Sequence, residues 1–271
     1  MKKLYLFLTL LVFVSCEKEL DIDYHKVAPL AVVEGGVMDN GCDVRLTTTL
    51  EMADSTGAQG IKDAKVVITS LADGSSSILK YKSYGHYVST FKGEPGNTYQ
   101  LDIWQGDNHF SAQSTMPHPP VIKSFIFQWQ EIMGRRIVMA DLRFLDTPNE
   151  ENYYYMNVYR NGESYRWTVI RDILNPGGEI QQVFGCMSEE MVKDNKPEDQ
   201  DQILNDGDKI TIELASIDRI TYDYLYALQL SGRSSSNPVS NISGGCLGCF
   251  LAAAVAHYEC TYQTAEIISL Q

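Results

Sequence analysis

Thr98-Tyr-Gln-Leu-Asp-Ile-Trp104 alternates apolar and polar side chains over seven residues. This is the period of a strand with one face on a core and the other toward solvent. From Ala31 to Thr115, similar short segments are separated by turn residues, such as Gly93-Glu-Pro-Gly96, whose glycines readily adopt positive φ. Turns recur about every eight to twelve positions, which predicts a β-sandwich with about six or seven strands, an immunoglobulin-like module.

Pro117-His-Pro-Pro120 marks the clearest boundary in the chain. Prolines cannot continue a hydrogen-bonded ladder, and they stiffen a connection toward polyproline geometry. The sequence therefore predicts a linker at 117–121 between an immunoglobulin-like β-sandwich at 30–116 and a second domain at 122–271. The alternative interpretation is a proline-rich edge loop inside one larger sandwich.

The second domain is predicted to be mostly β and sandwich-like, so the fold class is mainly β. Residues 122–132 and 136–145 form an expected hairpin, and Asn161-Gly162 is a strong signal for another. One helix is expected near 217–230, capped by Ser216, and the segment 247–255 is expected to close this domain as a strand. The apolar residues predicted to share one face of the helix are Ile217, Ile220, Tyr224, Leu225 and Leu228.

The first fifteen residues have the pattern of an export signal. Lys2 and Lys3 precede an apolar run that is interrupted only by Thr9 and ends at Ser15-Cys16. The run is too short to span a bilayer. Removal of residues 1–15 would leave Cys16 as the first residue, ready to accept acyl chains that anchor the protein to outer-membrane lipid. Residues 16–29 would then form a lipidated acidic tether. The alternative is a secreted protein with Cys16 in a disulfide.

The charge balance restricts the partners. The 271 residues carry a net charge of −13, which becomes −15 once Lys2 and Lys3 are removed with the signal. Such an acidic chain is poorly suited to bind nucleic acid or to hold anionic lipid through basic side chains. No cofactor is predicted, because no phosphate-binding glycine loop is present in the sequence.

The order of short motifs resembles one family, the Bacteroidota lipoproteins grouped as domain-of-unknown-function family 4249. The resemblance spans nearly the whole mature chain and includes the signal with Cys16. Its other motifs are Leu30-Ala-Val-Val-Glu-Gly35, Phe91-Lys-Gly-Glu-Pro-Gly-Asn-Thr-Tyr99, Ser114-Thr-Met-Pro117, Glu150-Glu-Asn-Tyr-Tyr154, Tyr159-Arg-Asn-Gly162, Asn237-Pro-Val-Ser-Asn-Ile-Ser-Gly-Gly245, Leu247-Gly248 and Phe250. The resemblance implies a partner of a TonB-dependent outer-membrane transporter, and it assigns no catalytic residues.

Two further features are given by resemblance. The acidic residues after Cys16 resemble the signal that sends Bacteroidota lipoproteins to the outer leaflet, facing the cell exterior; the alternative is a solvated linker. These residues are Glu17, Glu19, Asp21 and Asp23. Asp54-Ser55-Thr56 resembles a Bacteroidota O-glycosylation acceptor, with Ser55 as the modified residue.

Cys246 and Cys249 are separated by two residues, which matches the first pair of ligands in a zinc knuckle. His257 and Cys260 follow them and are also residue types that bind zinc. In an oxidising compartment, the same cysteines would instead form disulfides. Cys42 and Cys186 could form another pair. Cys246 and Cys249 also depart from the pattern of the family, so we expect them to be specific to this chain.

No nucleophile elbow of the form Gly-x-Ser-x-Gly occurs in the sequence. Together with the anchor pattern and the acidic balance, the family resemblance implies a surface-exposed, non-enzymatic outer-membrane lipoprotein that acts as an accessory subunit of a TonB-dependent transporter in nutrient uptake. One alternative is a free-standing adhesin or glycan-binding lipoprotein in which Trp104, Trp129 or Trp167 stacks on sugars. A second alternative is a hydrolase of unrecognised type, since two of the acidic residues could meet in space.

Overall fold

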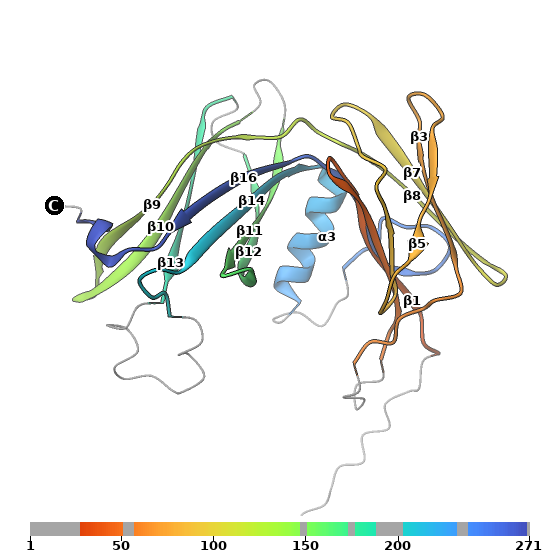
Figure 1. Ribbon diagram of the computed structural model, residues 1–271, viewed down its shortest axis with the longest axis horizontal. Helices are drawn as coiled ribbons and strands as arrows, with labels where there is room; N and C mark the ends of the chain where they lie inside the picture. The colour runs from red at the N-terminus through yellow and green to blue at the C-terminus, as the bar shows by residue number, and fades with distance from the viewer. Residues whose placement is uncertain are drawn as a thin grey trace, which may run out of the picture.

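The computed structural model describes residues 28–50, 57–146, 151–172, 177–187, 203–231 and 238–269. These residues are mostly in strands, and they form two lobes with a single α-helix between them, as Figure 1 shows. The prediction of a mainly β fold with sandwich-type domains is confirmed.

The first lobe packs two sheets against each other. One sheet has the strand order β15-β1-β2-β6-β5 and the other has the order β4-β3-β7-β8. Their buried residues form one apolar core. The strands are β1 (Ala31–Met38), β2 (Gly41–Thr48), β3 (Lys65–Ser70), β4 (Ser76–Ile78), β5 (Lys80–Tyr81), β6 (His86–Ser89), β7 (Thr98–Gln105), β8 (Asn108–Thr115) and β15 (Leu247–Ala253).

The second lobe also has two four-stranded sheets, with the orders β13-β10-β9-β17 and β12-β11-β14-β16, around a second core. The turn Asn161-Gly162 joins β11 to β12, and both residues have positive φ, 54° and 87°, as its sequence predicted. The strands are β9 (Val121–Ile132), β10 (Arg135–Leu145), β11 (Tyr153–Arg160), β12 (Glu163–Arg171), β13 (Glu179–Cys186), β14 (Lys209–Ile217), β16 (Val255–Thr261) and β17 (Ile268–Ser269), with a 3₁₀ turn at Thr264–Glu266.

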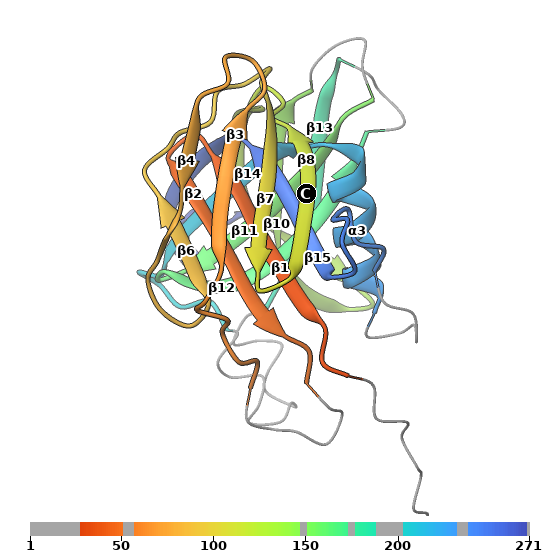
Figure 2. The same ribbon diagram turned by 90° about the vertical axis from the view of Figure 1, so that its right-hand side faces the viewer.

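β15 lies in a different lobe from the one that the sequence predicted. We expected the segment 247–255 to close the second domain, but β15 runs parallel to β1 at the edge of the first lobe (Figure 2). After Ala254 the chain continues directly into β16, which pairs with β14 of the second lobe. One nearly continuous extended segment therefore belongs to both lobes.

Glycines allow this pairing. A Cβ on Gly248 would lie 1.8 Å from the carbonyl oxygen of Val33, its register partner on β1. A Cβ on Gly36 would lie 1.8 Å from the carbonyl oxygen of Leu251. Gly248 also has a φ of 113°, which favours glycine. The two backbones approach so closely that no side chain fits at these positions.

Helix α3 (Arg219–Leu230) begins two residues later than predicted. Asp218 caps it instead of Ser216: its carboxylate accepts a hydrogen bond from the Thr221 amide at 2.8 Å. The predicted apolar face is partly wrong. Ile217 still belongs to β14, Ile220 is 58% exposed, and the buried residues are Thr221 and Tyr224.

A buried polar contact joins α3 to the first lobe. Ser114, at the end of β8, donates a hydrogen bond to the second carboxylate oxygen of Asp218 at 2.6 Å. The Ser114 hydroxyl in turn accepts a hydrogen bond from the Ala252 amide on β15 at 2.9 Å. Beside it, a small apolar cluster contains Tyr153 and Ala253, one from each lobe. The cap of the helix is thus also a contact between β8, β15 and α3.

We predict that Gly248→Ala lowers the free energy of unfolding by more than about 2 kcal/mol, because the new methyl group would strike the Val33 carbonyl group. The matched control is Gly74→Ala. Gly74 also has a positive φ, 73°, but nothing lies within 4 Å of its added Cβ. Urea unfolding of both variants would measure the difference. Equal losses would show that close approach of β1 and β15 is unimportant.

Candidate functional site

The predicted cysteine and histidine cluster does not assemble. Cys246 and Cys249 lie in and beside β15 of the first lobe, whereas His257 and Cys260 lie on β16, paired with Glu213 and Ile210. In the described part of the chain, no group of three or more His, Cys, Asp or Glu residues could hold a metal ion. The crossing from one lobe to the other separates these four residues, so their prediction as one site is wrong.

The five described cysteines are free thiols. Cys42 belongs to the core of the first lobe and Cys186 to that of the second, so the disulfide that the sequence allowed between them does not form. Burial raises the pKa of the Cys249 thiol to about 12. All five thiols except the half-buried Cys260 are buried, and they act as small apolar side chains, because a buried and protonated thiol is a poor nucleophile.

Other predicted residues lie outside the described residues and stay predictions. They are Cys16, Glu17, Glu19, Asp21, Asp23 and Ser55.

The three tryptophans lie on three different sheets. Trp104 on β7 stacks on His109 of β8 at 5.1 Å between ring centroids, and the Lys65 ammonium on β3 lies 4.9 Å from its ring. Trp104 is 40% exposed, but both of its cross-strand neighbours lie against the indole, which leaves less of its face for a sugar. The Arg136 guanidinium lies 4.4 Å over the ring of Trp129.

Trp167 is part of a row of polar and aromatic side chains. Trp167, Asn157, Glu213 and His257 are successive cross-strand partners on β12, β11, β14 and β16. Their neighbours along β11, Met156 and Val158, are in the core, so the row occupies the opposite, outer face of the sheet. We call these four residues the outer row.

Tyr159 and His257 position the carboxylate of Glu213 in the outer row. The Tyr159 hydroxyl donates to Glu213 Oε2 at 3.1 Å, and His257 Nδ1 lies 3.8 Å from Glu213 Oε1. Burial, and then the charge of Glu213, raise the pKa of Tyr159 to about 12. Tyr155 packs edge-on against Trp167 with ring centroids 6.0 Å apart. An indole, an amide, a carboxylate and an imidazole in line can bind a polar ligand with an apolar face.

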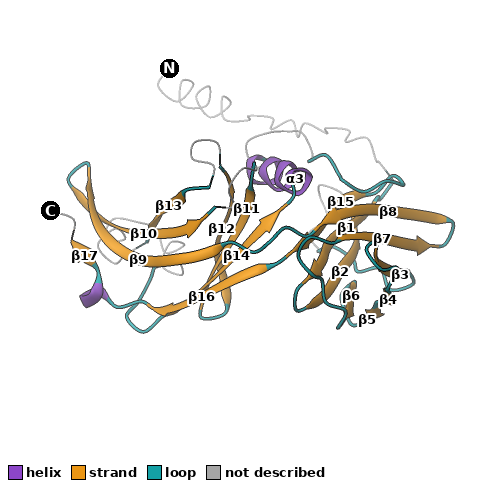
Figure 3. Cartoon of the chain, turned by 90° about the horizontal axis from the view of Figure 1, so that it is seen from above, coloured by secondary structure: helices purple, strands orange, loops and turns teal. Residues whose placement is uncertain are grey.

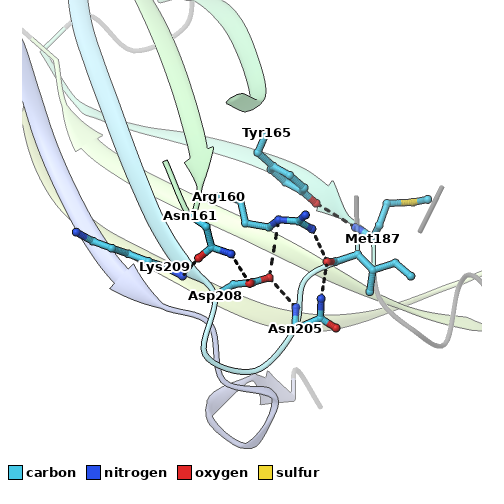
Figure 4. Close-up of polar contacts among 8 residues, drawn as sticks. Arg160, Asn161, Tyr165, Met187, Asn205, Asp208 and Lys209 are labelled. Atoms are coloured by element: carbon cyan, nitrogen blue, oxygen red, sulfur yellow. Dashed lines mark hydrogen bonds and ion pairs between the residues drawn. The ribbon is translucent and has the colours of Figure 1, made fainter. Parts of the chain in front are cut away.

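A second polar cluster lies at one end of the second lobe (Figure 4). Arg160 donates to the Ile203 carbonyl group at 2.6 Å, and its Nε lies 4.0 Å from the Asp208 carboxylate. The same carboxylate accepts hydrogen bonds from Asn161 Nδ2 at 2.7 Å and from the Asn205 amide at 2.8 Å. Asn161 also accepts from the backbone amide of Lys209 at 2.9 Å.

This second cluster is structural. Its side chains are mutually satisfied around the Asn161 turn and the start of β14. Tyr165 accepts a hydrogen bond from the Met187 amide at 3.3 Å, and burial raises the pKa of Tyr165 to about 12, so its phenol stays protonated at neutral pH. Met187 and Ile203, which precede and follow residues 188–202 in the sequence, form an isolated parallel bridge with each other.

The fold defines a class of protein: a two-lobed, mainly β protein built from sandwich-type sheets. The comparison with known families assigns the chain to one of them. The chain belongs to the family described as Domain of unknown function (DUF4249), which matches residues 17–259. No curated protein matches the chain. Within the described residues, the single α-helix is too short and too polar to cross a membrane.

Sequence reasoning named Trp167 and His257, but it gave them separate roles and missed Asn157 and Glu213. The alternation along β11 and β14 indicates which residues share a face. Which strands are neighbours, and in what register, follows only from the fold.

We predict that Tyr159 titrates near pH 12 in the folded protein. The wild type should therefore show one such titration that the Tyr159→Phe variant lacks. Since the folded pKa lies above the ordinary value of 10, this group stabilises the fold below pH 10 and loses that contribution as the pH rises toward 12. Glu213→Gln should lower the pKa, because it removes a neighbouring negative charge. Ultraviolet titration of both variants tests this, and an unchanged pKa in Glu213→Gln would contradict the arrangement.

Proposed function

We propose that this protein is a surface-exposed, acylated outer-membrane lipoprotein of the Bacteroidota that serves as a non-enzymatic accessory subunit of a TonB-dependent transporter in nutrient uptake. The observation that carries the proposal is the order of the first 38 residues: export signal, Cys16, acidic residues, and then β1. Membership of the DUF4249 family supports it, because the sequence also resembles that family in these features.

The place of β1 supports an anchor at this end. Only residues 17–30 separate Cys16 from β1, so the body would be held within reach of the membrane, at most about 3.5 Å per residue of tether. β1 lies between β15 and β2 and pairs with both along its length. A lipid anchor would therefore hold the protein through an interior strand rather than a frayed end.

The buried tyrosines and cysteines offer no ready nucleophile, which is in keeping with a binding role. The phenols of Tyr159 and Tyr165 have pKa values raised to about 12, and the buried thiols of Cys186 and Cys249 are raised similarly. These groups are poor bases and nucleophiles at neutral pH. The polar groups around Asp208 are engaged with one another, as structural networks are.

We predict that the tagged full-length protein, extracted in detergent from the membranes of its own cells, retains a β-barrel transporter in about equal amount. The Cys16→Ala variant should be lost from the membrane fraction, because it lacks the cysteine sulfur that would carry the lipid. Mass spectrometry of the retained proteins provides the readout. Recovery of the lipoprotein without a barrel would contradict the transporter role, and Cys16→Ala remaining in the membrane would contradict the anchor.

The outer row favours one second function, a free-standing glycan-binding lipoprotein. It places an indole beside an amide and a carboxylate, the groups that bind a sugar ring and its hydroxyls. We predict that Trp167→Ala lowers glycan-array binding by about tenfold or more, whereas Trp104→Ala, whose ring is flanked by Lys65 and His109, changes it little. No binding by the wild-type protein would rule out this second function.

A further inference from the structure

The β13-β10-β9-β17 sheet has an unusual outer face. Phe125, Val138, Ala140 and Leu142 point into the core, so the residues between them face outward. Several of the outward residues are apolar and remain half-buried or exposed. These residues, which we call the apolar sheet face, are Ile126, Ile132, Ile137, Met139, Leu145, Val183 and Ile268.

Within the described residues, the other sheets and α3 lie toward the first lobe. Figures 1 and 3 show β9 and β10 at the end of the long axis opposite the first lobe, with β11, β14 and α3 lying between. Polar side chains such as Gln128, Gln130 and Arg143 lie among these apolar residues on the same face. Exposed apolar residues grouped on one sheet face and rimmed by polar ones commonly mark a contact with another protein.

A buried carboxylate lies in the middle of the apolar sheet face. Asp141 is 1% exposed, and its Oδ2 accepts hydrogen bonds from Gln181 at 2.8 Å and from Arg143 at 3.3 Å. Its Oδ1 is buried with no hydrogen-bond partner. The Arg143 side chain is 43% exposed and also lies 3.3 Å from Glu179, so Asp141 is not its sole partner. An unpaired buried carboxylate oxygen is costly, and a donor from a partner would remove that cost.

The tip of the same hairpin is also exposed and strained. β13 pairs with β10 only from Val138 onward, and β17 pairs with β9 only at residues 128 and 129, so residues 130–137 project as two strands. Met133 at the tip is 99% exposed and has a φ of 53°. A non-glycine residue in this conformation is uncommon and mildly strained, and this one is apolar and in water.

We propose that the apolar sheet face, with Met133 at its edge, is the docking surface for the transporter subunit of the proposed function, on which this inference rests. The partner presents apolar side chains and one basic side chain that pairs with Asp141. The charge of the chain, −13, opposes docking of a second copy or of anionic lipid. The predicted tether leads into β1 of the first lobe, at the other end of the molecule from this face (Figure 1).

A photo-crosslinking residue placed at Met139 in the full-length protein tests this in whole cells. The control places the same residue at Ile78, which is 63% exposed on β4 of the first lobe. The expected result is a crosslink from position 139 to the β-barrel protein that detergent extraction retains, at least about tenfold stronger than from position 78. Crosslinks from both positions equally, or from position 139 to a second copy, would overturn the docking surface.

Two substitutions separate the docking surface from the proposed function. Met139→Glu should reduce recovery of the barrel by about tenfold or more, and Asp141→Asn should reduce it less, while Ile78→Glu leaves it unchanged. Thermal unfolding of each variant shows whether it is folded. If folded Met139→Glu recovers the barrel as the wild type does, the surface is wrong and the transporter role stands. If the wild type recovers no barrel, both fail.

Discussion

The parallel pairing of β15 with β1 is the constraint on which the rest of the structure depends. It completes the edge of the first lobe with a segment more than two hundred residues distant in sequence, and it brings Phe250 and Ala252 into the core of that lobe. Gly36 and Gly248 permit it, because each faces a carbonyl group across the two strands. Closing so long a loop is entropically unfavourable, so the contacts that β15 makes must exceed that cost.

The same strand fixes the relation of the two lobes. β15 continues into β16 through one residue, so the connection between these two paired strands leaves little room for one lobe to move against the other. The contact of Ser114 with Asp218 and Ala252 adds a buried polar link beside that point. A tether that leads into β1 therefore holds both lobes. This places the outer row and the apolar sheet face at fixed positions relative to β1, the strand into which the predicted tether leads.

Local features of the fold were predictable from sequence, and long-range ones were not. The alternation in Thr98–Trp104 and the Asn161-Gly162 pair gave the strand β7 and a hairpin, because both depend on neighbours in sequence. The partner of β15 was missed, since periodicity does not say which sheet edge a strand joins. The cysteine cluster failed for the same reason, and the helix face was shifted because Asp218 caps α3 and leaves Ile217 in β14. The outer row and Asp141 require a register that only the folded sheets provide.

The most direct test of this account is to compare two fragments of the first lobe. One contains residues 28–116, and the other joins residues 28–116 through a flexible linker to residues 238–254, which supply β15. The account predicts that the joined fragment unfolds cooperatively in urea with a native near-ultraviolet circular dichroism signal, whereas residues 28–116 alone show neither. If residues 28–116 alone fold with the same stability as the joined fragment, the pairing of β15 with β1 is dispensable and the central claim is wrong.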